Sequence, residues 1–270
     1  MKALDFRDRW VVVTGASSGL GEQLARRLAS HHRARLILVA RRRERLAALR
    51  EELRAAHGTE VVLLPMDLAA PDAAERIFTE ATRERQVYAV ISNAAAYWFG
   101  EFTAMPEPQV EQLLRVNVRT PLLLLRRFLP YLDQRGEGGI LVITSTGAMM
   151  PTPRQALYGG TKALLQGFVE SLYHERGRER ERVPVCLCSP GGMLTEMLVS
   201  SPVLEQLRHR PLIIRMMMRP EVVARRALRA FRRRRFLTVP GIRNQLMVLL
   251  SKVLSKRRVG KGAARIYGSR

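Results

Sequence analysis

Short apolar runs alternate along this chain with longer segments in which leucine recurs every third or fourth residue. A strand that is apolar throughout is buried on both faces, whereas the longer recurrence predicts a helix with one buried face. We therefore expect strands at 9–14, 36–39, 61–64, 87–92, 140–144, 183–188 and 236–239. We expect helices at 44–56, 107–129, 158–176 and 220–235, one that carries Leu20, Leu24 and Leu28, and one that Pro71 and Asp72 open.

Two prolines interrupt the longest helical segment. Proline has no N–H group, and its ring clashes with the carbonyl group four residues earlier, so it kinks or ends a helix. We expect helix 107–129 to be interrupted at Pro121 and to stop at Pro130.

The alternation of apolar strands and helices predicts the fold class. Strands that alternate with helices form a parallel sheet through right-handed crossovers. We expect an α/β fold of the Rossmann type, a doubly wound sheet of about seven parallel strands with helices on both faces. The sequence shows no linker, repeat or low-complexity segment, so we expect a single domain over 1–270.

The charge of +22 over 270 residues changes this picture little. Nearly all the cations are arginines spread over many predicted helices, which favours solvated helix faces over a nucleic-acid-binding site, and we expect no nucleic-acid partner. We also expect a cytoplasmic protein, because no segment has the apolar length of a membrane span and the N-terminus does not resemble a signal peptide. The only lysines are Lys2, Lys162, Lys252, Lys256 and Lys261.

The two cysteines stand two positions apart in the predicted strand at 183–188. That spacing places the side chains of Cys186 and Cys188 on one face of the strand, where free cysteine acts as a small apolar residue. A single C-x-C without a neighbouring His or Cys cluster is a poor metal site, and we expect no metal.

A glycine-rich turn, Thr14-Gly15-Ala16-Ser17-Ser18-Gly19-Leu20-Gly21, joins the first strand to the first helix. Glycine allows the chain to turn sharply and to approach a phosphate closely, and the helix N-terminus presents unpaired N–H groups to it. The position of the turn after a buried first strand predicts a nucleotide site.

The spacing T-G-x-x-x-G-x-G resembles the cofactor turn of the short-chain dehydrogenase/reductase family, in particular its NADP-dependent 3-ketoacyl and hydroxysteroid reductases. Further marks of that family follow in order. They are Ala40-Arg41-Arg42, Met66-Asp67-Leu68, Asn93-Ala94-Ala95, Asn117, Ser145, Tyr158-x-x-x-Lys162, and Ser189-Pro190-Gly191 with Thr195. The resemblance covers residues 9–195 closely and the rest loosely. One departure is Ala95, where the family usually has glycine, and it puts cofactor affinity and placement in question.

The resemblance implies a dinucleotide cofactor. The residues that would bind it are Gly15, Ser17, Ser18, Gly19, Leu20, Gly21, Arg41, Arg42, Asp67, Leu68, Asn93, Ala94, Tyr158, Lys162, Pro190, Gly191 and Thr195. Family members that prefer NAD(H) carry an acid at the end of the second strand, where this chain has Ala40 followed by two arginines. A guanidinium pairs with a 2′-phosphate, so we expect NADP(H), with use of both cofactors as the main alternative.

The resemblance also implies the interconversion of a ketone and an alcohol by hydride transfer. Tyr158 would donate the proton, and Lys162, four residues later on the same helix face, would lower the pKa of its phenol. Ser145 would hydrogen-bond the substrate carbonyl, and Asn117 would interrupt a helix and hold water that connects Lys162 to solvent. The alternative is a dinucleotide-binding scaffold or regulator without turnover, which the intact catalytic positions disfavour.

Two C-terminal regions concern the partners. By resemblance, 191–220 is a substrate lid, and its bulky apolar residues fit either a large lipophilic carbonyl or alcohol substrate or ordinary packing and a dimer contact. We expect a homodimer or homotetramer. The basic extension 241–270 carries apolar residues at helical spacing, which fits peripheral membrane contact or packing on the chain's own domain or a partner subunit.

Overall fold

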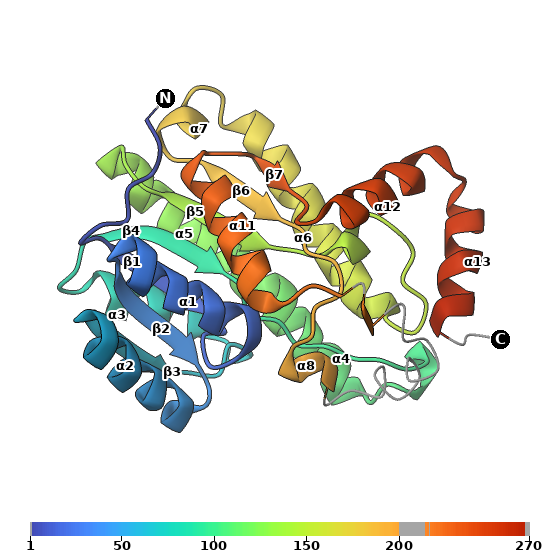
Figure 1. Cartoon of the computed structure of the whole chain (residues 1–270), viewed down its shortest axis with the longest axis horizontal. Coiled ribbons are helices and arrows are strands. Elements are labelled where there is room, and N and C mark those ends of the chain that lie inside the picture. The colour runs from blue at the N-terminus through green and yellow to red at the C-terminus, as the bar shows by residue number, and fades with distance from the viewer. Residues whose placement is uncertain (1, 200–213, 216, 268–270) are drawn as a thin grey trace.

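The computed structural model describes residues 2–199, 214–215 and 217–267, and within them seven parallel strands form one sheet (Figure 1). The strand order is β3-β2-β1-β4-β5-β6-β7, so the direction of winding reverses between β1 and β4. The strands are β1 (Trp10–Thr14), β2 (Arg35–Ala40), β3 (Val61–Pro65), β4 (Val87–Ser92), β5 (Gly139–Ile143), β6 (Val185–Cys188) and β7 (Leu237–Thr238). The predicted doubly wound α/β fold is confirmed. Folds of this kind bind their ligands at the carboxyl ends of the strands.

Helices cover both faces of the sheet (Figure 1). The buried residues of α1, α2 and α11 form one apolar cluster with the strands, and those of α3, α5 and α6 form a second on the opposite face. The bounds are α1 (Gly19–His32), α2 (Arg43–His57), α3 (Ala73–Thr82), α4 (Glu107–Leu114), α5 (Thr120–Arg135), α6 (Ala156–Glu175), α7 (Glu179–Arg182), α8 (Glu196–Val199), α11 (Pro220–Arg232), α12 (Ile242–Val253) and α13 (Lys256–Tyr267).

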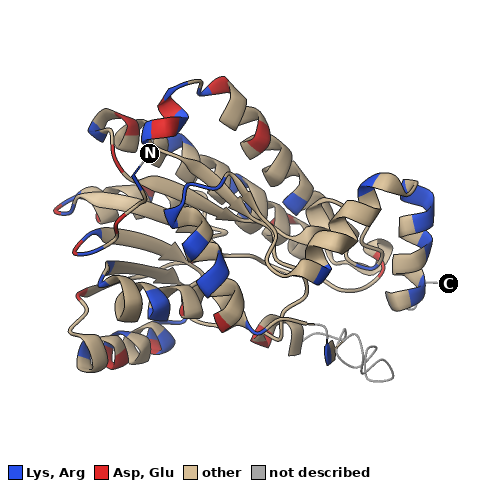
Figure 2. Ribbon diagram, turned by 45° about the horizontal axis from the view of Figure 1, so that its top comes forward, with Lys and Arg blue, Asp and Glu red and all other residues tan. Residues whose placement is uncertain are grey.

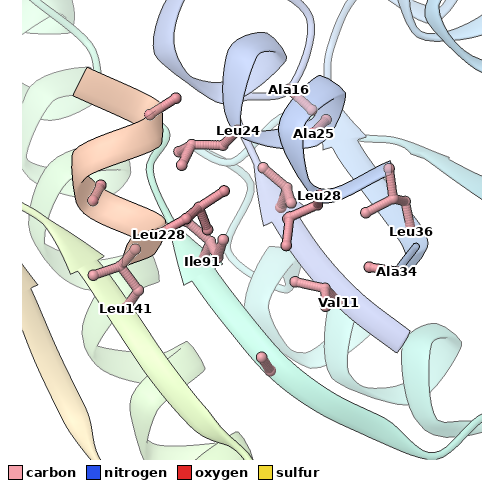
Figure 3. Packing of buried hydrophobic residues seen from close by; sticks show 14 of the residues in the cluster. Val11, Ala16, Leu24, Ala25, Leu28, Ala34, Leu36, Ile91, Leu141 and Leu228 are labelled. Atoms are coloured by element: carbon pink, nitrogen blue, oxygen red, sulfur yellow. The ribbon is translucent and has the colours of Figure 1, made fainter. Parts of the chain in front are cut away.

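The first cluster fixes the position of α1 on the sheet (Figure 3). Leu24 and Leu28 of α1 meet Leu228 of α11 above Ile91 of β4 and Leu141 of β5, and all five side chains are buried. Each buried leucine contributes roughly 1.5–3 kcal/mol relative to an exposed one. This packing holds the N-terminus of α1 at the carboxyl end of β1.

The expected helix stop at Pro130 is wrong. A π-helical turn at Arg115–Arg119 separates α4 from α5, Pro121 lies in the first turn of α5, and α5 continues through Pro130 to Arg135. Pro130 is exposed, so the carbonyl group that loses its hydrogen bond, that of Arg126, lies on the solvent side where water can replace the bond. Phe128 and Leu132 stay buried on either side of the proline.

Cys186 and Cys188 are buried and free, and both belong to the first cluster, as their spacing predicts. Burial raises the pKa of each thiol to about 12, so neither is a thiolate near neutrality. In the part of the chain that the structure describes, no three His, Cys, Asp or Glu side chains gather in a way that could hold a metal ion.

The predicted C-terminal helix is the first of two. Helices α12 and α13 form a hairpin at one end of the molecule (Figure 1), and Val248 is the buried residue of α12. Figure 2 shows basic but no acidic residues along this hairpin. None of the helices in the described ranges has both the length and the apolar character needed to cross a membrane. Residues 200–213 and 216 of the expected lid, and 268–270 of the extension, lie outside the described residues.

Candidate active site

A cavity of about 380 Å³ opens at the carboxyl ends of the strands. Most of the residues singled out from the sequence line it, although they come from positions as far apart as 15 and 195. Those in the lining are Gly15, Ser17, Ser18, Gly19, Leu20, Arg41, Arg42, Asp67, Leu68, Asn93, Ala94, Ser145, Tyr158, Lys162, Pro190, Gly191 and Thr195. Gly21 and Asn117 do not line it and lie behind residues that do.

The glycine turn lies against the start of the loop after β4. Gly15 has a φ of +69°, and a Cβ there would come within 2.8 Å of the Cα atom of Ala94. Gly19 has a φ of +56°, and a Cβ on it would meet the Thr195 side chain at 3.2 Å. A Cβ on Gly21 would collide with the carbonyl oxygen of Gly15. Side chains at these three positions would therefore distort or fill the turn.

Helix α1 begins at Gly19 without a side-chain cap. Its N-cap residue, Ser18, makes no capping hydrogen bond. The first N–H groups of a helix lack intrahelical acceptors, and an anion at the N-terminus can bind them. Gly19 and Leu20 line the cavity at this point, so the cavity fits the pyrophosphate of a dinucleotide.

Asn93 joins the two strands on either side of the winding reversal. Its side-chain amide donates to the carbonyl oxygen of Thr14 at 2.9 Å, and its backbone N–H donates to the Thr14 hydroxyl at 3.0 Å. The backbone N–H of Ala94 donates to the same hydroxyl at 3.1 Å. These bonds hold the end of β4 against the end of β1, beside the cavity.

Arg42 lies at the end of the cavity that follows β2. Its guanidinium donates to the hydroxyl of Ser18 at 2.7 Å and to that of Ser17 at 3.2 Å. It also donates to both carboxylate oxygens of Glu196, which lies in the stretch after β6. The sequence reasoning identified Arg42 and both serines but missed Glu196. The available signal was a single acid within an apolar run, Met193 to Leu198.

Ser145, Tyr158 and Lys162 lie together at another part of the cavity. Ser145 follows β5, and its hydroxyl accepts a hydrogen bond from the N–H of Gly147 at 3.1 Å and is hydrogen-bonded to the phenol of Tyr158. Tyr158 and Lys162 both belong to α6 and point to the same side, with Nζ of Lys162 5.9 Å from the centre of the Tyr158 ring. Lys162 is only 2% exposed.

The electrostatics of this group differ from the expectation. Burial raises the pKa of Tyr158 to about 12, although the hydrogen bond with Ser145 acts in the opposite direction. Burial lowers the pKa of Lys162 to about 8. The Lys162 ammonium donates to the carbonyl oxygen of Ile143 at 3.2 Å, not to the phenol. The expected lowering of the phenol pKa by this cation is therefore wrong for the chain alone, where desolvation is the larger effect.

Asn117 lies in the π-helical turn between α4 and α5 and is fully buried. Its side-chain oxygen accepts from the N–H of Ala96 at 2.7 Å, and its amide donates to the Ala96 carbonyl at 2.9 Å and to the Thr161 hydroxyl at 3.2 Å. Asn117 thus connects the loop after β4 to α6, at the residue before Lys162.

Tyr97 lies beside Tyr158 and belongs to a small apolar cluster. The Tyr97 ring meets the Tyr158 ring edge-on, with centres 5.0 Å apart. Phe99 is buried, and Leu198, Ile214 and Met217 pack around it together with Tyr97. Leu198, Ile214 and Met217 belong to the expected lid 191–220, whereas no motif marks Tyr97.

A family model described as short chain dehydrogenase matches residues 9–203, which is more than half of the chain. A 7beta-hydroxysteroid dehydrogenase of Clostridium sardiniense is 31% identical over 195 residues, covering 71% of this chain and 73% of that protein. An "inactive hydroxysteroid dehydrogenase-like protein 1" of Rattus norvegicus is 28% identical over 62% of this chain and 51% of its own. A very-long-chain 3-oxoacyl-CoA reductase of Aspergillus clavatus is 33% identical over 62% of this chain. The chain thus spans only about half the length of the latter two relatives.

Solved structures with the same arrangement of elements extend the similarity over nearly the whole chain. A 7beta-hydroxysteroid dehydrogenase structure matches with a TM-score of 0.85 at 22% identity, covering 98% of this chain and all of that one. A short-chain dehydrogenase from Sphingobium yanoikuyae in complex with NADPH matches with a TM-score of 0.79 at 27% identity, covering 91% of this chain and 93% of that one. The first of these likenesses supports the fold alone.

Proposed function

The chain belongs to the short-chain dehydrogenase family of oxidoreductases that act on CH–OH groups, and on that premise we propose that it is an NADP(H)-dependent enzyme that interconverts a bulky lipophilic ketone and its secondary alcohol. The observation that carries the proposal is the set of residues that line one cavity. Tyr158, Lys162 and Ser145 line the same cavity as the glycine turn and the arginine pair after β2.

Each residue of the group has a role that follows from its chemistry. A bound nicotinamide would supply the hydride. Ser145 would hold the carbonyl oxygen through its hydroxyl and stabilise the negative charge that develops there. Tyr158 would protonate that oxygen, because a phenol with a pKa of about 12 remains a far stronger acid than an alcohol. Lys162 would hold the ribose hydroxyls of the cofactor and place a positive charge beneath the phenol.

Asn117 would act through position rather than by contact with the substrate. Its amide holds Thr161, the neighbour of Lys162, and it lies where a helix widens into a π turn. Such turns occur frequently at functional sites. We infer that Asn117 keeps the loop at Ala96 and the start of α6 in register, and that it supports the water path which returns a proton to Lys162.

The preference for NADP(H) is supported by the cations at the ribose end. Ala40 ends β2 without the acid that would bind a ribose diol, and Arg41 and Arg42 line the cavity next to it. A planar guanidinium pairs well with a phosphate. Asp67, from the loop after β3, lines the cavity where it would flank the adenine.

A lipophilic substrate is supported by the apolar side of the cavity. Val116, Met193 and Met197 line it, and Tyr97 lies beside Tyr158. Methionine adapts to irregular apolar shapes, which suits a polycyclic or long-chain ligand better than a small polar one. The substrates in the names of the relatives, hydroxysteroids and 3-oxoacyl-CoA, belong to this class.

A non-catalytic function is the second candidate, because the relative from Rattus norvegicus carries the word inactive in its name. The candidate proton donor and its lysine are both present in this chain, Lys162 being the only lysine between positions 2 and 252. This favours turnover over a dinucleotide-binding scaffold or regulator.

Two surfaces support the expected partners. Leu164 and Phe168 of α6 are exposed one turn apart, and we propose that they pack against a second copy of the chain in a homodimer or homotetramer. The α12–α13 hairpin carries seven Lys or Arg and no acid between residues 241 and 267, and Leu249, Leu250 and Val253 are each more than half exposed. We propose that the protein is cytoplasmic and that this hairpin lies on an anionic membrane surface.

The experiment that tests the function is NADPH consumption by the purified protein against a panel of steroid and long-chain 3-oxoacyl ketones, repeated with NADH. Binding of each cofactor is measured separately, through the fluorescence of the reduced nicotinamide. Turnover of at least one bulky ketone is expected. Tight NADPH binding without turnover of any ketone or of the corresponding alcohols would favour the non-catalytic alternative, and failure to bind either dinucleotide would overturn both.

A further inference from the structure

Glu196 is the first residue of helix α8, and its carboxylate bridges two arginines at the start of α2. Its carboxylate accepts hydrogen bonds from Arg42 at 2.9 and 3.1 Å and from Arg45 at 2.6 Å. Arg42 is the N-cap residue of α2 and Arg45 lies in its first turn, about 150 residues earlier in the chain. The stretch after β6 is thereby connected to the segment after β2 by charge.

The Glu196 carboxylate accepts hydrogen bonds from Arg42, one of the two arginines that support the proposed preference for NADP(H). All three guanidinium nitrogens of Arg42 already donate, to Ser17, Ser18 and Glu196. To bind Arg42, a 2′-phosphate therefore has to replace one of these partners as the acceptor of its N–H groups. The serine hydroxyls can turn and donate to a phosphate themselves, whereas a carboxylate can only accept and repels the phosphate.

The charge state of Glu196 makes this competition permanent near neutrality. Hydrogen bonds from Arg45 and Arg42 lower the pKa of its carboxyl to about 2. The carboxylate is thus ionised whenever a phosphate could bind. Glu196 also lies at the proposed cofactor site, because it lines the cavity and its neighbour Thr195 lies against Gly19 of the glycine turn.

We propose that Glu196 is a cofactor-selectivity residue, which acts as an internal anion at the 2′-phosphate site and weakens the preference for NADP(H) over NAD(H). The inference rests on the proposed dinucleotide function and goes beyond it. With NADP(H), the phosphate displaces the carboxylate from Arg42 and Arg45. With NAD(H), which has no 2′-phosphate, the carboxylate stays on both arginines and supplies from α8 the acid that is missing after β2.

The test compares binding of NADPH, NADH and 2′,5′-ADP to the wild-type chain and to Glu196→Gln, by calorimetry at fixed salt. We expect Glu196→Gln to lower the Kd of NADPH and of 2′,5′-ADP by roughly three- to tenfold, because exposed ion pairs are individually weak. The Kd of NADH should not fall. This gain in affinity for NADPH and 2′,5′-ADP should shrink at high salt, which screens exposed charges.

Glu44→Gln is the matched control. Glu44 lies beside Arg45 on the exposed side of α2, so this variant changes the net charge equally without removing the bridge. It should leave the ratio of the two dinucleotide Kd values within twofold of wild type. The inference is overturned if Glu196→Gln changes NADPH and NADH binding in parallel, if it leaves NADPH binding unchanged, or if Glu44→Gln has the same effect. A wild-type chain that binds neither dinucleotide overturns the proposed function itself.

Discussion

The ammonium of Lys162 lies 5.9 Å from the centre of the Tyr158 ring, on the same side of α6 and at the end of β5, with the lysine buried and the tyrosine half-buried. The bond from its Nζ to the Ile143 carbonyl oxygen holds the lysine in place without involving the phenol. In the chain alone, the two groups are therefore neighbours whose pKa values are set mainly by burial, the phenol's upward and the ammonium's downward.

Removal of the Tyr158 hydroxyl should remove the proton donor and leave the cofactor site intact. We expect Tyr158→Phe to lower kcat for ketone reduction by about 10²- to 10⁴-fold, the usual contribution of a general acid. The Kd of NADPH should change less than threefold, measured by nicotinamide fluorescence. Tyr173→Phe, also on α6 but outside the cavity lining, is the control and should retain wild-type turnover. A Tyr158→Phe enzyme with full activity would remove Tyr158 from the mechanism.

Lys162 should lower stability at neutral pH. Its pKa is about 8 in the folded chain against an ordinary 10.5, so the unfolded chain binds this proton more tightly and the protonated lysine destabilises the fold below pH 8. The cost is about 3 kcal/mol, since one pKa unit corresponds to about 1.4 kcal/mol, and it disappears as the pH rises from 8 towards 10.5. We expect Lys162→Met to be more stable than wild type at pH 7 but inactive.

Urea unfolding of wild type and Lys162→Met at pH 7 and pH 10 measures this difference. The stability gap should be largest at pH 7 and should narrow at pH 10. The two cysteines titrate in both proteins and cancel in the comparison. An equal gap at both pH values would mean that the buried lysine is not the titrating group.

Asn117 should be a stability residue as well as a positioning residue. Asn117→Ala removes three hydrogen bonds of a fully buried side chain, among them the one to the buried Thr161 hydroxyl, and losing the partner of a buried polar group costs about 1–3 kcal/mol. We expect a loss of that size in the free energy of unfolding, together with a lower kcat. The control is Gln134→Ala, an exposed amide on α5, which should change stability by less than about 0.5 kcal/mol. Unchanged stability of Asn117→Ala would contradict the three bonds described for it.

The exposed pair on α6 should hold two copies of the chain together. Leu164 and Phe168 are 49% and 41% exposed. We expect light scattering to find a dimer or tetramer for the wild type and a folded monomer for the double variant Leu164→Asp, Phe168→Asp. A variant of unchanged mass would exclude this face as the subunit contact.

The C-terminal hairpin should bind vesicles that contain phosphatidylglycerol and should not bind pure phosphatidylcholine. We expect Leu249→Asp, Val253→Asp to abolish sedimentation with the anionic vesicles, because it removes buried apolar contact and adds negative charge. Lys252→Gln, Lys256→Gln should weaken binding, whereas the same loss of charge on α2, in Arg50→Gln, Arg54→Gln, should not. If the hairpin instead joins two subunits, its variants will change the molecular mass and the wild type will not sediment with vesicles.

The order of elements in this chain follows from local patterns. The predicted strand at 87–92 is apolar up to its last residue, and the structure has that strand at the same residues, Val87–Ser92. The error at Pro130 shows the limit of this reasoning, because the cost of a proline depends on which side of the helix it occupies. That side is decided by the packing of Phe128 and Leu132, which the local pattern does not contain.

For the site, the sequence by itself determined which groups are the candidates for the chemistry: the glycine turn, the arginines after β2, and Ser145, Tyr158 and Lys162 are marked by type and spacing. Only the tertiary structure decided their surroundings. The Tyr97 ring meets the Tyr158 ring edge-on, and the Glu196 carboxylate pairs with Arg42, although the two residues of each pair are distant along the chain. Burial by the surrounding elements moves the pKa values of Tyr158 and Lys162. Spacing specifies what one helix or turn presents, whereas desolvation and charge pairing depend on which elements the sheet brings to the same edge.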